Sequence, residues 1–137
     1  MTRSAWLSLS IVGVVVGLVA CGDDPAPGTI TVSAHAVTGG QGKLLITEAR
    51  IGGRQAAISC IPIAADPFDA TVILETIVGP TPCETSSPIV LDAGTYDIKS
   101  VVMMGGAAAP DTCAVGQVEV AGNVAIDLPA FTAAGCQ

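Results

Sequence analysis

Short runs of alternating apolar and polar residues follow one another along most of this chain. Residues 29–37, TITVSAHAV, are the clearest, since the apolar residues from Ile30 to Ala36 would face one side and the polar ones, including His35, the other. An alternation of period two predicts a β-strand that is buried on one face. Similar runs predict further strands at 43–51, 54–61, 70–78, 87–91, 95–104, 114–120 and 124–131.

Turn-forming residues separate these runs and predict how some of them pair. Gly52-Gly53 separates two runs and predicts a tight hairpin, because both glycines can adopt positive φ. Ala121-Gly122-Asn123 predicts a second hairpin, in which Val120 pairs with Val124. The residues that would then share one inner face are Val118, Val120, Val124, Ile126 and Leu128. The pattern therefore predicts an all-β fold, a single small antiparallel β-sandwich of about seven to eight strands over residues 29–137.

The first 20 residues have a different composition. Residues 1–6 carry one positive charge, at Arg3, and residues 7–20 are uncharged and mostly apolar. A membrane-spanning helix needs about 20 such residues, so the run fits the apolar part of a signal peptide better. The alternatives are an uncleaved anchor and a buried strand. We expect residues 1–20 to form a signal helix.

The apolar run ends at Leu18-Val19-Ala20-Cys21, which resembles the lipobox of bacterial lipoproteins. The resemblance implies that the Cys21 sulfur receives a diacylglycerol, that cleavage occurs before Cys21, and that the mature chain is held on a membrane. Two acyl chains suffice for stable attachment. Because Gly22 rather than Asp follows, the resemblance favours the outer membrane, with the domain in the periplasm or facing the surface. Residues 21–28 would be the lipidated cysteine and a flexible, extended tether.

The segment from Leu91 to Tyr96, LDAGTY, resembles the tyrosine corner of immunoglobulin-like sandwiches, and equally that of transthyretin-like, carboxypeptidase-regulatory-like sandwiches. The resemblance implies that Tyr96 packs under a crossing between the sheets, that its hydroxyl bonds back to the main chain, and that Asp92 and Gly94 shape the corner. An antibody-type domain is excluded, because its strand cysteine would fall at Ile98. The alternative is an ordinary turn followed by a core tyrosine.

The chain has five cysteines. Lipidation of Cys21 would leave four, which an oxidising compartment favours as two disulfides. Zinc is the alternative, but the chain has no C-x-x-C spacing and one histidine.

Three pairings of these four cysteines are possible. The predicted hairpin puts Cys113 opposite Phe131, so a short turn would bring Cys136 back to it. Cys60 and Cys83 remain for the second bridge, although strand 70–78 would separate them unless its flanking loops bend back. We therefore favour Cys113–Cys136 with Cys60–Cys83.

The net charge is −7, and no basic cluster interrupts it, which argues against nucleic-acid binding. The candidate catalytic residues are Asp66 and Asp69, in DPFD, together with His35. Acidic residues beside proline commonly form turns, and no nucleophile motif accompanies them, so we expect no catalytic residues, no metal and no cofactor.

These observations together indicate a function class but no ligand. We expect a non-enzymatic binding, adaptor or structural module in the cell envelope, with the membrane and an envelope protein as its partners. One alternative is a small hydrolase or metal-assisted enzyme. The other is an accessory or inhibitor domain for an envelope enzyme.

Overall fold

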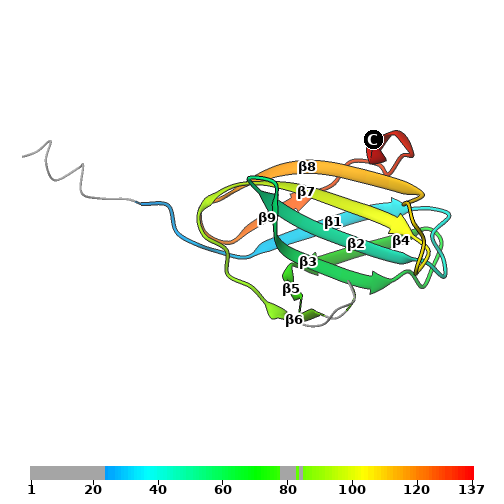
Figure 1. The fold of residues 1–137 in the computed structure, drawn as a ribbon, viewed down its shortest axis with the longest axis horizontal. Coiled ribbons are helices and arrows are strands. Elements are labelled where there is room, and N and C mark those ends of the chain that lie inside the picture. The colour runs from blue at the N-terminus through cyan, green and yellow to red at the C-terminus, as the bar shows by residue number, and fades with distance from the viewer. Residues whose placement is uncertain (1–23, 78–82, 84) are drawn as a thin grey trace, which may run out of the picture.

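The computed structural model describes residues 24–77, 83 and 85–137, and this part of the chain is an all-β sandwich (Figure 1). A three-stranded sheet in the order β4-β1-β9 packs against a six-stranded sheet in the order β6-β5-β3-β2-β7-β8. No helix in these residues is long and apolar enough to cross a membrane. The elements are β1 (Ile30–Val37), β2 (Leu44–Ile51), β3 (Arg54–Pro62), β4 (Phe68–Ile73), β5 (Glu75–Ile77), β6 (Thr85–Pro88), β7 (Gly94–Met103), β8 (Thr112–Val120), β9 (Val124–Asp127) and the 3-10 helix η1 (Ala134–Cys136).

The hairpin predicted at Gly52-Gly53 is confirmed. Strands β2 and β3 pair antiparallel on either side of it, and the two glycines have φ values of 57° and 78°. Positive φ at both central residues matches the right-handed twist of the two strands. This hairpin and β7, which pairs with the other side of β2, form the middle of the larger sheet.

The core lies between the two sheets and follows the predicted alternation closely on β7. Tyr96, Ile98, Ser100 and Val102 are all buried on one face of that strand. The one polar member is satisfied, because the hydroxyls of Ser100 and Thr47 lie 2.7 Å apart and hydrogen-bond across β2 and β7. Met104, expected on the same face, lies just beyond the strand and is 53% exposed.

The prediction of a single strand over residues 70–78 is wrong. The chain leaves the smaller sheet at Ile73 and enters the larger one at Glu75, so β4 and β5 belong to different sheets. Leu74, between them, is completely buried, and its amide donates to the Ile30 carbonyl. A run of consecutive apolar residues concealed this crossing, because it does not show which of them faces the core.

The prediction of a hairpin between β8 and β9 is also wrong. Strand β8 pairs with β7, whereas β9 pairs in parallel with β1 in the other sheet, so the sandwich is not wholly antiparallel. The predicted common face is nevertheless present, since its five residues pack into one core. They do so because β8 and β9 face each other across the sandwich: a Cβ on Gly116 would lie 2.8 Å from Ile126 Cδ1.

The amino-terminal segment joins the sandwich earlier than the predicted start at residue 29. The Ala26 carbonyl accepts a hydrogen bond from the Gly122 amide, and Gly28 pairs with Leu91 through two main-chain hydrogen bonds. The Asn123 side chain also accepts from the Thr29 amide at 3.0 Å. Residues 26–28 of the expected tether are therefore held against the sandwich. The expected signal peptide and Cys21 lie outside the described residues. The first described residues and the carboxy terminus lie at opposite ends of the sandwich (Figure 1).

Candidate functional site

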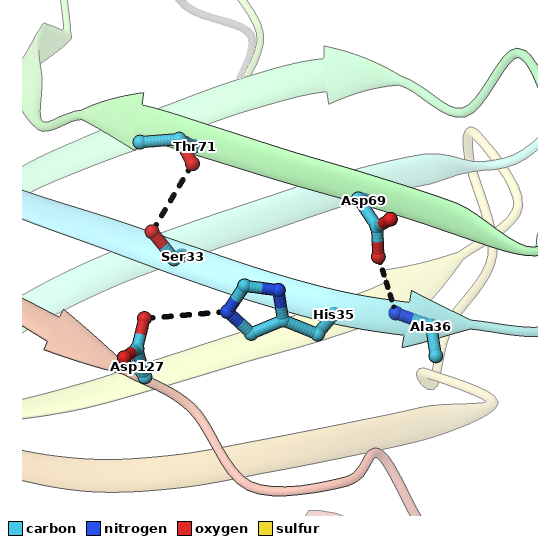
Figure 2. Close-up of polar contacts among 6 residues, drawn as sticks. All are labelled: Ser33, His35, Ala36, Asp69, Thr71 and Asp127. Carbon is cyan, nitrogen blue, oxygen red and sulfur yellow. Dashed lines mark hydrogen bonds and ion pairs between the residues drawn. The ribbon is translucent and has the colours of Figure 1, made fainter.

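The candidate acid–base residues lie around a β-bulge near the end of β1. Between the pairs Ala34–Ala70 and Val37–Phe68, two residues of β1 oppose the single residue Asp69. Ala36 consequently has a φ of 52° and is exposed, and Val37 takes the buried position expected for Ala36. The Asp69 carboxylate accepts a hydrogen bond from the Ala36 amide at 2.6 Å (Figure 2), so it stabilises the bulge.

Asp66 and His35 have other partners. The Asp66 carboxylate accepts from the Gly39 amide at 3.1 Å and thereby holds the turn after β1. His35 Nε2 lies 3.3 Å from Asp127 Oδ1 on β9, and these two side chains are 59% and 78% exposed. Within the described part of the chain, no hydrogen bond or ion pair joins His35 to either Asp66 or Asp69. This arrangement gives a shared catalytic role no support.

The outer face of the smaller sheet is polar around these residues. The Ser33 and Thr71 hydroxyls hydrogen-bond at 3.1 Å between β1 and β4, beside the His35–Asp127 pair (Figure 2). Such pairs between neighbouring strands contribute modestly to sheet stability. Among the described residues, no group of three His, Cys, Asp or Glu side chains is placed to hold a metal ion.

All four remaining cysteines form disulfides, in the pairing favoured from the sequence. The Cα atoms are 4.9 Å apart in Cys60–Cys83 and 5.0 Å apart in Cys113–Cys136. Zinc binding by these four thiolates is therefore excluded. The geometry behind the prediction was partly wrong, because Cys113 pairs with Thr132 rather than Phe131. The segment after β9 crosses to the edge of the larger sheet and meets β8 there.

Tyr96 forms the hydrogen bond implied by the corner resemblance. Its side chain is 2% exposed, and its hydroxyl donates to the Asp92 carbonyl at 2.8 Å. Burial raises the pKa of Tyr96 above its ordinary value of 10.0, and the Asp92 carboxylate raises it further. Gly94 begins β7 two residues before this tyrosine. The corner thus ties the start of β7 to the connection that precedes it.

A groove of about 670 Å³ lies on the outer face of the larger sheet, where β2, β7 and β8 adjoin. Two polar contacts order its lining: Arg50 Nε donates to Glu48 Oε1, and Gln117 Nε2 donates to Asp97 Oδ1, both at 3.0 Å. The lining residues are Glu48, Arg50, Asp97, Ile98, Lys99, Val115, Gly116 and Gln117.

Sequence reasoning missed this groove. The polar positions on the exposed sides of the predicted strands were the available signal, but the order of the strands was needed to bring them together. In comparisons with known proteins, no protein-family model, no curated protein and no solved structure matched the chain.

Proposed function

We propose that this chain is a lipid-anchored envelope lipoprotein whose β-sandwich is a non-enzymatic binding module. The single observation that carries the anchoring is the lipobox-like sequence ending at Cys21. Cys21 lies five residues before Ala26, the first of the described residues that is hydrogen-bonded to the sandwich. A diacylated cysteine at that position would supply the two acyl chains that stable membrane attachment requires.

The short separation between anchor and domain gives the module an orientation. An extended chain spans at most about 3.3–3.6 Å per residue, so Ala26 would lie within about 18 Å of Cys21. The end of the sandwich that carries Ala26, Gly28 and the 121–123 turn would therefore face the membrane. The opposite end, with the bulge at Ala36 and the carboxy terminus, would face away from it.

Binding is favoured over catalysis by the contacts of the candidate acid–base residues. Asp66 and Asp69 hold main-chain amides, and His35 lies in solvent against Asp127. The groove on β2, β7 and β8 is lined by other residues. It offers both signs of charge and an apolar side chain, which suits recognition of a ligand by a sheet surface.

Metabolic labelling in a bacterial host tests the anchoring. The chain should incorporate an alkyne analogue of palmitate and partition into the detergent phase, and Cys21→Ser should abolish both. The double variant Cys113→Ser/Cys136→Ser is the matched control, because it removes two cysteines but no lipid site, so it should still be labelled. Labelling of Cys21→Ser at the wild-type level would contradict the proposal. Fractionation of the labelled cells would show whether the protein is in the outer or the inner membrane.

A further inference from the structure

Strand β8 is the least protected sheet edge in the described residues. Native proteins commonly protect edges by shortness, proline, bulges or covering segments. Strand β9 has four residues, β6 has four and ends in Pro88, and β4 is irregular against β1 at the bulge. Strand β8 has nine residues in unbroken register with β7, without proline or lysine. Among the described residues, its other side is covered only at the start, where Cys113 pairs with Thr132.

The uncovered part of this edge presents main-chain groups suited to pairing with another strand. Cys113 exchanges two hydrogen bonds with Thr132, of 2.9 and 3.0 Å, so its amide and carbonyl point away from β7. In an antiparallel pair this direction alternates along the strand. The amides and carbonyls of Val115, Gln117 and Glu119 therefore point the same way, along a side of β8 that no described strand covers. The chain's own carboxy-terminal segment already pairs with the first of these outward-pointing positions, Cys113.

The exposed side chains of this edge determine which side chains an added strand would need opposite them. Val115 is 51% exposed and lies next to Lys99 in the register, and Gln117 lies next to Asp97. Both belong to the groove lining. Glu119 is the last exposed residue of the edge and lies beside the uncharged Thr95. The edge thus offers, in order, an apolar, an amide and an acidic side chain on one face.

We propose that the free edge of β8 binds an extended segment of a partner protein as an added antiparallel strand. The segment carries a basic residue opposite Glu119, a polar residue opposite Gln117 and an apolar residue opposite Val115. In the direction of the partner chain the order is basic, polar, apolar at every second position, because side chains alternate along a strand. A basic residue also suits a chain of net charge −7. This inference rests on the proposed role as a binding module.

A second copy of this chain fits the edge less well. Antiparallel pairing of two β8 strands centred on Gln117 would place each Glu119 opposite an apolar Val115. Such a pair would also point the two Ala26 ends in opposite directions, about a strand length apart. The Ala26 ends of both copies could not then face one membrane in the orientation proposed above. The occupant is therefore a segment of another protein.

Titration of the full chain, purified in detergent, with two fluorescent peptides tests the proposal. The matched probe is acetyl-Ser-Arg-Val-Thr-Val-Tyr-Ser-amide, and the control probe has the same composition in reversed order. We expect saturable binding of the matched probe at least tenfold tighter than that of the control. Amide exchange should slow at Val115, Gln117 and Glu119, which alternate with residues already paired to β7. Equal binding of the two probes, or no saturable binding at millimolar concentration, would overturn the proposal.

Edge-specific variants locate the binding. Gln117→Pro removes an amide that points away from β7, and proline is tolerated at such edge positions. It should weaken the matched probe at least tenfold. Ala125→Pro is the matched control on the β9 edge. The Val124 amide donates to the Thr29 carbonyl, just before β1, and the Leu128 amide donates to the Ser33 carbonyl in β1. Because this direction alternates along the strand, the Ala125 amide points outward. That variant should bind the probe normally.

Reversing the charge of Glu119 tests the same binding without introducing a proline into the strand. Glu119→Lys should weaken the probe with arginine and strengthen a version with glutamate in its place. An unchanged preference, or a concentration-dependent dimer cross-linked through β8, would overturn the assignment to a partner protein. The anchoring is tested separately by Cys21→Ser, so failure of either proposal is distinguishable from failure of the other.

Discussion

The Tyr96 hydroxyl donates a hydrogen bond to the main-chain carbonyl of Asp92, four residues earlier, at a distance of 2.8 Å. Tyr96 lies at the start of β7, beside the connection that also pairs Leu91 with Gly28. One side chain therefore joins the core of the larger sheet to the end of the sandwich where the amino-terminal segment enters. This contact leads to two predictions.

Tyr96→Phe should lower the free energy of unfolding by about 1–3 kcal/mol. The ring would still fill its site, but the Asp92 carbonyl would lose its partner in a partly buried hydrogen bond. Chemical denaturation monitored by circular dichroism measures the change. Asp92→Asn is the matched control, because the hydrogen bond uses the main-chain carbonyl, and it should change stability much less. Equal effects of the two variants would show that the contact acts through the Asp92 side chain instead.

The stability of the wild-type protein should fall as the pH rises through and above about 10. Burial, and then the Asp92 carboxylate, raise the pKa of Tyr96 in the folded state above the value of 10.0 that it has when unfolded. The unfolded state therefore loses its proton first, and the contribution present below pH 10 is lost as the pH rises towards the folded-state pKa. Denaturation at pH 9 and at pH 11 measures this. Tyr96→Phe should show a smaller loss between them, and an equal loss would contradict the assignment.

The sequence predicted the elements of this fold better than their connections. Alternating burial on β1, β2 and β7 follows directly from side-chain period, and the positive φ at Gly52 and Gly53 follows from glycine chemistry. Which sheet each strand joins depends instead on packing between distant segments. The crossing at Leu74 and the parallel pairing of β9 with β1 are both of this kind.

The same contrast between local pattern and distant packing applies to the candidate sites. The cysteine pairing was predicted from a hairpin between β8 and β9 that is absent, and it is nevertheless right, because Cys113 meets Thr132, one residue beyond the expected Phe131. The groove and the free edge of β8 were not predicted, because they exist only once β2, β7 and β8 are known to be neighbours. Local composition in DPFD drew attention to Asp66 and Asp69, which the structure shows holding main-chain amides.

Ala36→Gly should stabilise the protein by about 0.5–1 kcal/mol. Ala36 has a φ of 52°, a conformation that costs an L-residue about 1 kcal/mol and glycine very little. The Asp69 carboxylate can still accept from the amide at that position. Ala125→Gly is the matched control, an exposed alanine in the regular strand β9, and it should destabilise by a similar amount. Destabilisation by Ala36→Gly would show that the Ala36 methyl group makes a compensating contact.

Removing either disulfide should lower stability by about 3 kcal/mol, because each closes a loop of similar length, with a sequence separation of 23. The two variants should nevertheless loosen different parts of the molecule. Cys113→Ala/Cys136→Ala releases the segment that pairs with the start of β8 through Thr132. Hydrogen exchange should therefore accelerate at the position 113 amide in that variant but not in Cys60→Ala/Cys83→Ala, as amide exchange measured by NMR would show. Equal protection at position 113 in both variants would mean that the Thr132 pairing holds the carboxy-terminal segment on β8 without the covalent bond.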